Sequence, residues 1–180
     1  MILNSSLPKV LESTAVVRFQ DCDPFGHLNN ARYVDYFMNA RTDQLQAHYD
    51  FNIFAVGQEI GSNWVVSKTE IVFLLPALLM ETVRIQTRLI LATSRKLVIE
   101  GIMFDEGGQQ IKAVAWVEFT FVSLANGRPA SHTEELMQLF TAVQVHDIYG
   151  TTTFDERVNQ LRQAQRQKRR EKAQAANAYA

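Results

Sequence analysis

The sequence contains a single cysteine, Cys22, so no disulfide can form within one chain. An unpaired cysteine of this kind fits a reducing compartment, and we expect a cytoplasmic location. Charges of the two signs nearly cancel, with 18 Lys and Arg against 19 Asp and Glu and a formal net charge of -1. This balance gives no overall electrostatic reason to expect a nucleic-acid partner.

Long hydrophobic runs are also missing. The longest apolar stretch, residues 71–80, is interrupted by Pro76 and reaches about half of the ~20 residues that a membrane-spanning helix needs. The sequence has no GxGxxG or P-loop motif, and its histidines are too scattered for a zinc site. We therefore expect no membrane span, no metal and no other cofactor.

The first third of the chain predicts one strand and one long helix. Residues 14–19 are β-prone and end at a Pro/Gly turn. Asn29 or Asn30 is a suitable N-cap for a helix that continues to about Tyr49. The apolar stripe of this helix runs from Tyr33 to His48 and is broad, which indicates deep packing.

After residue 63 the hydrophobic period changes to that of β-strands. Alternation of apolar and polar residues predicts consecutive strands, and the last of them is apolar on both faces, which favours a central position in a sheet. One long helix followed by consecutive strands predicts an α+β fold, with an antiparallel sheet wrapped around the helix. The expected strands cover residues 63–73, 83–91, 97–104 and 111–122, and a short helix covers residues 131–140.

The last forty residues differ in composition from the rest. Thr153 and Glu156 predict a capping box, and the helix that follows carries a short apolar stripe before a run of Arg and Lys. We expect residues 141–180 to form a helical, basic and partly frayed extension. An oligomer contact or an anionic partner is the alternative role for this extension.

A carboxylate on the turn before the long helix is the main candidate for chemistry. Pro24 and Gly26 shape a sharp turn beside Asp23, and the first amides of the helix lack intrahelical partners. Such amides polarise a carbonyl group, while Asp23 acts as general base or as nucleophile. A turn or capping aspartate is the structural alternative. Calcium is excluded because Phe25 and Arg32 occupy EF-hand ligand positions.

Residues 18–30, with Tyr33, Tyr36 and Arg41, resemble the hotdog-fold acyl-CoA thioesterases of the 4-hydroxybenzoyl-CoA thioesterase type. The similarity covers about residues 12–140, which we expect to form the thioesterase domain. The resemblance implies hydrolysis of an acyl-CoA thioester to a carboxylic acid and free CoA, without metal or cofactor. It also implies a homodimer or homotetramer in which the sheets continue from one protomer to the next.

The same resemblance assigns roles to individual residues. Asp23 is the implied catalytic carboxylate, and the amides around Asn29 and Asn30 polarise the carbonyl. His27 and Tyr33 line the substrate pocket between two protomers. Gly26 contributes to substrate binding through the turn.

Two departures from the family pattern, the residue Met38 and the basic extension after Gly150, leave other interpretations open. Many relatives carry a Glu at the position of Met38, and a salt bridge from such a residue to Arg41 is not available here. A non-catalytic acyl-CoA-binding module is therefore one alternative. A hydratase or dehydratase that uses Asp23 with His27 is another, although the order Asp-Pro-Phe-Gly-His differs from the Asp-x-Asn-Pro-x-His arrangement of those enzymes.

The charged residues outside the main candidate also have expected roles. The expected ion-pair partner of Asp21 is Arg18 or Arg41. Arg84, Arg88, Arg95, Lys96 and Arg128 are candidates for CoA phosphates, or plain surface charges.

Overall fold

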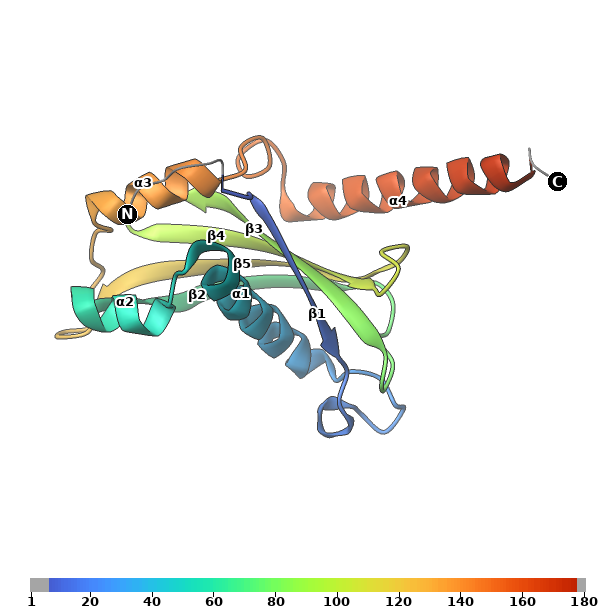
Figure 1. Ribbon diagram of the computed structural model, residues 1–180, viewed down its shortest axis with the longest axis horizontal. Coiled ribbons are helices and arrows are strands. Elements are labelled where there is room, and N and C mark those ends of the chain that lie inside the picture. The colour runs from blue at the N-terminus through green and yellow to red at the C-terminus, as the bar shows by residue number, and fades with distance from the viewer. Residues whose placement is uncertain (1–6, 178–180) are drawn as a thin grey trace.

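The computed structural model describes residues 7–177 and shows an antiparallel sheet of five strands wrapped around one long helix (Figure 1). The strand order is β1-β3-β4-β5-β2, so the predicted α+β class and hotdog fold are confirmed. The strands are β1 (Val10–Val16), β2 (Ser62–Phe73), β3 (Thr82–Ala92), β4 (Lys96–Asp105) and β5 (Ile111–Ser123). The helices are α1 (Tyr33–Tyr49), α2 (Ile53–Ile60), α3 (Glu134–Val143) and α4 (Phe154–Asn177).

Helix α1 lies directly against the middle of the sheet. A Cβ atom at Gly101 in β4 would lie 2.6 Å from the Phe37 ring, so this glycine permits the close approach. The buried stripe of α1 ends at Tyr49, and the expected position His48 is exposed. Gln44 is also buried, and its side-chain amide donates to Ser13 Oγ and to the Ile85 carbonyl oxygen. These bonds satisfy a polar group that the apolar pattern did not include.

The predicted strands lie within about two residues of those observed, with one exception. Strand β1 begins at Val10 and ends at Val16, which is earlier than the β-prone run indicated. The position of β5 between β4 and β2 confirms that the strand with two apolar faces is central. Helix α2 was not predicted, although the Asn52 side chain caps it by accepting from the amides of Phe54 and Ala55.

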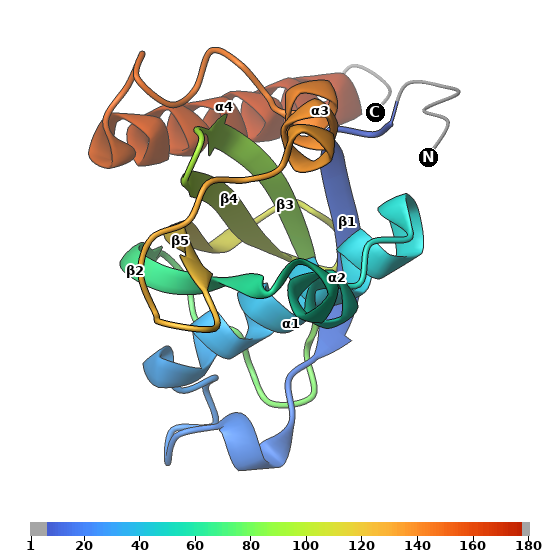
Figure 2. The ribbon, with the colours of Figure 1, turned by 90° about the vertical axis from the view of Figure 1, so that its left-hand side faces the viewer.

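Helix α4 covers the outer face of the sheet, opposite α1 (Figure 2). The capping box forms as predicted, because the Thr153 amide donates to Glu156 and the Glu156 amide donates to Thr153 Oγ1. Val158 is buried in a cluster with residues of β4 and β5. The last three residues of the expected extension, 178–180, lie outside the described part of the chain.

A buried ion cluster joins α4 to the sheet. Glu100 of β4 is fully buried and receives the Arg157 guanidinium, with Nε 2.8 Å from Oε1 and a second nitrogen 3.1 Å from Oε2. Arg88 Nε lies 3.1 Å from the same carboxylate, and the Trp116 indole N–H donates to it. One carboxylate therefore holds two guanidinium groups from different elements.

Within residues 7–177 no helix is both long and apolar enough to cross a membrane.

Buried His132 connects the loop before α3 to β2. Its Nε2 accepts a hydrogen bond from the Trp64 indole N–H at 3.0 Å, and its Nδ1 lies 2.9 Å from the Thr93 carbonyl oxygen. The proton therefore resides on Nδ1, and the ring is neutral. Burial lowers the pKa of His132 below its ordinary value of 6.5, with the Thr93 contact opposing the shift.

We expect the free energy of unfolding to decrease as the pH drops through about 6.5, the ordinary pKa of histidine. The unfolded chain takes up a proton on His132 near pH 6.5, whereas the folded chain takes it up only at a lower pH. Stability from this residue is thus present above pH 6.5 and lost below it. Urea unfolding monitored by tryptophan fluorescence tests this, and His132→Phe should remove this part of the pH dependence. An equal pH dependence in His132→Phe would contradict the assignment.

Candidate active site

The turn before α1 fixes Asp23 through the backbone and through its own side chain. Its amide donates to the His27 carbonyl oxygen at 2.8 Å, and its carbonyl oxygen accepts from Gly26 at 3.0 Å. Gly26 has φ +73°, a conformation that strongly favours glycine. The carboxylate oxygen Oδ1 accepts from the Phe25 and His27 amides at 2.9 and 3.1 Å. Within residues 7–177 the second oxygen, Oδ2, has no hydrogen-bond partner, so it remains open for chemistry.

Asp21, the other acid of the turn, has a structural environment. Its carboxylate lies 3.0 Å from the Tyr36 hydroxyl and 3.8 Å from Arg32 Nε. The expected pairing with Arg18 or Arg41 is wrong, because Arg32 reaches Asp21 from the 3₁₀ turn Asn30–Arg32. Burial raises the pKa of Tyr36, and the hydrogen bond to Asp21 and its negative charge raise it further. The Tyr36 hydroxyl therefore stays protonated.

Cys22 lies between the two acids and is not a suitable nucleophile. Its thiol is 3.4 Å from the Arg18 carbonyl oxygen. Desolvation, followed by the charges of Asp21 and Asp23, raises the pKa of this thiol. The reactive thiolate is therefore disfavoured.

The two asparagines before α1 have different surroundings. The Asn29 amide donates to the Asp21 carbonyl oxygen, and its side chain accepts from the Ala31 amide. Asn29 thus caps the 3₁₀ turn that precedes α1 rather than α1 itself. Asn30 lines the cavity beside Asp23, and its backbone amide has no acceptor within residues 7–177. Of the two, Asn30 is the one placed to donate to a ligand.

A cavity of about 340 Å³ opens beside Asp23, within the size range of small-molecule sites. Tyr33 forms part of its wall, and the Tyr33 hydroxyl accepts from the Ala77 amide at 3.2 Å. Burial raises the pKa of Tyr33, so the hydroxyl is neutral. No group of three metal-binding side chains occurs in the described part of the chain. The cavity is lined by Asp23, His27, Leu28, Asn30, Tyr33 and residues 73–76.

The loop that forms the opposite wall, residues 74–81, is held in place by a buried lysine. Lys112 Nζ lies 2.7 Å from Glu81 Oε1 and donates to the Pro76 carbonyl oxygen at 2.9 Å. The loop also bonds directly to the Asp23 turn, because the Leu28 amide donates to Ala77 and the Leu79 amide donates to Gly26. Sequence reasoning missed the Lys112–Glu81 pair, which joins positions 31 residues apart.

Replacing Lys112 with Met should therefore disturb both the loop and the site. We expect a loss of about 2 kcal/mol in the free energy of unfolding, since Glu81 is left partly buried without its cation. We also expect a roughly tenfold lower activity, because the wall of the cavity is no longer fixed. Lys68→Met is the control, since Lys68 forms an exposed pair with Glu70. Equal effects of the two substitutions would contradict the positioning role.

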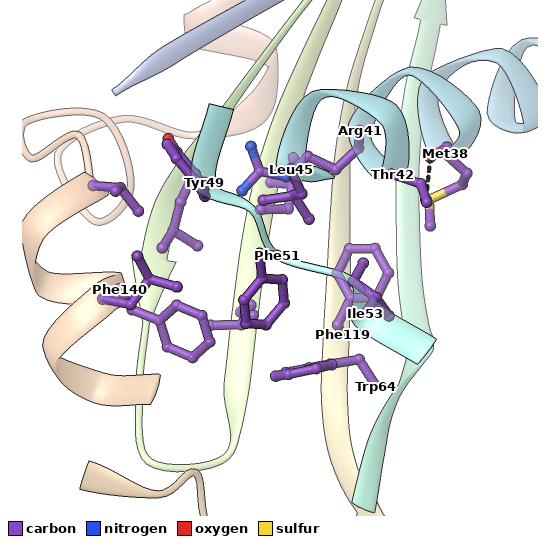
Figure 3. A pocket seen from close by; sticks show the side chains of 15 residues that line it. Met38, Arg41, Thr42, Leu45, Tyr49, Phe51, Ile53, Trp64, Phe119 and Phe140 are labelled. Atoms are coloured by element: carbon purple, nitrogen blue, oxygen red, sulfur yellow. Dashed lines mark hydrogen bonds between the residues drawn. The ribbon is translucent and has the colours of Figure 1, made fainter. Parts of the chain in front are cut away.

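A second cavity, of about 70 Å³, lies along the C-terminal half of α1 and does not include Asp23 (Figure 3). It is lined mostly by apolar side chains, with Arg41 as its charged group. Burial lowers the pKa of Arg41 to about 10, and its guanidinium contacts Thr87 Oγ1 at 3.3 Å. No ion pair joins Arg41 to a carboxylate among the described residues, and Met38 borders the same cavity. This agrees with the absence of an acid at position 38.

Comparison with known proteins identifies the class. A family model described as the Thioesterase-like superfamily matches residues 17–140. The chain belongs to this superfamily and is a thioester hydrolase with the hotdog fold. No match is found among curated proteins.

Solved structures share this fold. A probable thioesterase from Bartonella henselae is 24% identical, with 69% of this chain and 99% of that one covered and a TM-score of 0.63. The YbaW probable thioesterase from Escherichia coli is 22% identical, with 75% and 99% covered and a TM-score of 0.65. A DHNA-CoA thioesterase from Staphylococcus aureus is 16% identical, with 74% and 87% covered and a TM-score of 0.66.

Proposed function

We propose that this protein hydrolyses acyl-CoA thioesters to a carboxylic acid and free CoA, with Asp23 as the catalytic carboxylate. The observation that carries the proposal is the geometry of Asp23. Two backbone amides hold Oδ1, while Oδ2 is open beside a cavity that Asn30 also lines. Support for CoA as the thiol comes from the similar fold of the DHNA-CoA thioesterase.

The proposed reaction needs one carboxylate and one carbonyl-polarising group. The thioester carbonyl oxygen accepts a hydrogen bond from the Asn30 amide, which strengthens as negative charge develops on that oxygen. As general base, Asp23 takes a proton from water while the water oxygen attacks the carbonyl carbon. As nucleophile, Asp23 forms a mixed anhydride that water then hydrolyses. In both routes the carbon–sulfur bond breaks, and the CoA sulfur leaves and is protonated.

We assign this activity to the cytoplasm, in accord with unpaired Cys22.

An assay that measures CoA thiol release tests the proposal directly. Purified protein is incubated with short-chain, long-chain and aromatic acyl-CoAs, and free thiol is measured over time. We expect release from at least one of these classes, together with formation of the matching acid. Tight binding of intact acyl-CoA without thiol release would instead establish a binding module. Hydration of an enoyl-CoA without thiol release would establish a hydratase.

We also propose that the active unit is a homodimer or homotetramer that forms through the free edge of β2. This edge strand is twelve residues long and exposes Val65 and Val66 in its middle. Uncovered edge strands are templates for pairing with a second strand. Apolar side chains are also exposed around the Asp23 cavity: Phe25, Phe73, Leu75, Leu78, Leu79 and Met80. A second protomer would cover them.

Light scattering coupled to gel filtration tests this arrangement. We expect the wild-type protein to elute with at least twice the mass of one chain. Val66→Lys should shift it toward the monomer and lower activity, because a charge then lies in the interface. Val10→Lys on the other sheet edge, β1, is the matched control and should leave the mass unchanged. A monomeric wild type, or equal behaviour of both variants, would contradict the proposal.

A further inference from the structure

The inward stripe of α4 changes character along the helix. Phe154, Val158 and Leu161 pack against the sheet in its first two turns. The same face then continues with Gln165, Lys168 and Arg169, which lie outside the apolar clusters. Figure 1 shows the C-terminal part of α4 extending beyond the ends of the strands. The helix therefore presents polar and cationic side chains toward the protein.

These side chains border a cavity of about 700 Å³ between α4 and the outer face of β3 and β4, called the α4 cavity below. Its size lies within the range of sites for small organic ligands. Arg84, Gln86 and Arg88 of β3 line it from the sheet. The remaining lining residues are Ile102, Phe104, Gly107, Gly108, Gln109, Ile111, Arg157, Leu161, Ala164, Gln165, Lys168, Arg169 and Glu171.

Unsatisfied hydrogen-bond donors gather in this cavity. In the described part of the chain, three buried side-chain atoms lack a hydrogen-bond partner: Arg84 Nε, Arg88 Nε and Gln165 Nε2. All three residues line the α4 cavity, and all three atoms are donors. Arg88 Nε is close to Glu100, but without hydrogen-bond geometry. Because the Glu100 carboxylate already lies beside Arg88 Nε, the Arg84 and Gln165 donors are the two left for a ligand that supplies acceptors.

The charges around the cavity are also unbalanced. Arg88 and Arg157 share the single carboxylate of Glu100. Lys168 and Arg169 form no ion pair with any described side chain. Arg84 lies 3.5 Å from Glu12, and Glu171 accepts from Gln167. Five cations therefore line the cavity together with one acid, Glu171, while Glu12 and Glu100 pair with three of these cations from outside the lining. This imbalance favours an anionic ligand.

Part of the lining is apolar and indicates that the ligand is more than a phosphate ion. Phe104 and Leu161 are only partly buried and form the apolar part of the lining, and Arg84 lies over the Phe104 ring at 5.8 Å from its centroid. A planar base can pack on such a surface while phosphates meet the guanidinium groups. We propose that the α4 cavity binds a nucleotide that carries two or more phosphates. The site is independent of Asp23 and of the hydrolysis proposed above.

Calorimetric titration of the full-length protein with ADP tests the proposal without any turnover. We expect saturable binding that weakens as salt is added. Lys168→Gln combined with Arg169→Gln should weaken binding roughly tenfold or more, through loss of two charge-assisted contacts. Arg162→Gln combined with Arg166→Gln is the matched control, since it removes the same charge from α4 outside the cavity lining.

Three results would overturn the proposal. The first is no ADP binding at millimolar concentration, and the second is equal weakening by the two double variants. The third is pyrophosphate binding as tight as ADP binding, since the base would then contribute nothing. Competition with coenzyme A is a further experiment, because coenzyme A contains an adenine nucleotide. Displacement of ADP by coenzyme A would identify a bound coenzyme as the source of the nucleotide, whereas displacement by ATP alone would identify a free nucleotide.

Discussion

Asp23→Asn is expected to lower kcat/KM for acyl-CoA hydrolysis by roughly 10²- to 10⁴-fold, the usual contribution of a positioned acid or base. The asparagine keeps a carbonyl oxygen that can accept from the Phe25 and His27 amides, so the turn remains intact. What is lost is the group that takes a proton from water or attacks the carbonyl carbon. Steady-state thiol release, with circular dichroism to confirm folding, measures the effect.

Asp21→Asn is the matched control, two residues away in the same turn. Its carboxylate is already engaged by Tyr36 and Arg32, so we expect less than a tenfold loss of activity. A folded Asp23→Asn enzyme as active as wild type would remove Asp23 from the mechanism. Equal losses for both variants would show that the turn matters only as a structural element.

The largest loss of stability is expected at Glu100. Replacing it with Gln leaves Arg88 and Arg157 largely buried without a carboxylate, and we expect the free energy of unfolding to fall by about 3 kcal/mol. Urea unfolding monitored by far-UV circular dichroism gives this quantity. The loss should be accompanied by easier proteolysis within α4, because Arg157 then no longer holds that helix on the sheet.

Glu70→Gln serves as the control, because the Glu70–Lys68 pair is exposed and should contribute less than about 1 kcal/mol. A triple variant in which Glu100, Arg88 and Arg157 become Leu, Met and Met tests the explanation. It should recover much of the lost stability, since no buried charge remains unpaired. If Glu100→Gln were as stable as wild type, the cluster would not hold α4.

The site and the fold differ in how much of them could be predicted. Asp23, Gly26 and Asn30 lie within eight residues of one another, so turn chemistry indicated their proximity directly. Strand alternation likewise indicated the sheet. Glu100 and Arg157 are 57 positions apart, and their contact depends on how α4 crosses the sheet. No local pattern encodes such a contact.

Helix α2 is a different case, because a signal was present. Asn52 is a favourable N-cap, but Gly57 inside the segment argues against a helix. The structure explains this glycine, since a Cβ atom there would lie 2.6 Å from the Asn63 side chain. Tertiary packing between α2 and the start of β2 thus outweighs the low helix propensity of glycine.

The position of α4 also limits how copies of the protein can associate. Its first turns occupy the outer face of β4 and β5, so two protomers cannot stack these faces directly on each other. The edge of β2, through which we propose that the protomers join, lies outside the face that α4 covers. In the proposed assembly, α4 would close one face of the sheet while the protomers join along the plane of the sheet.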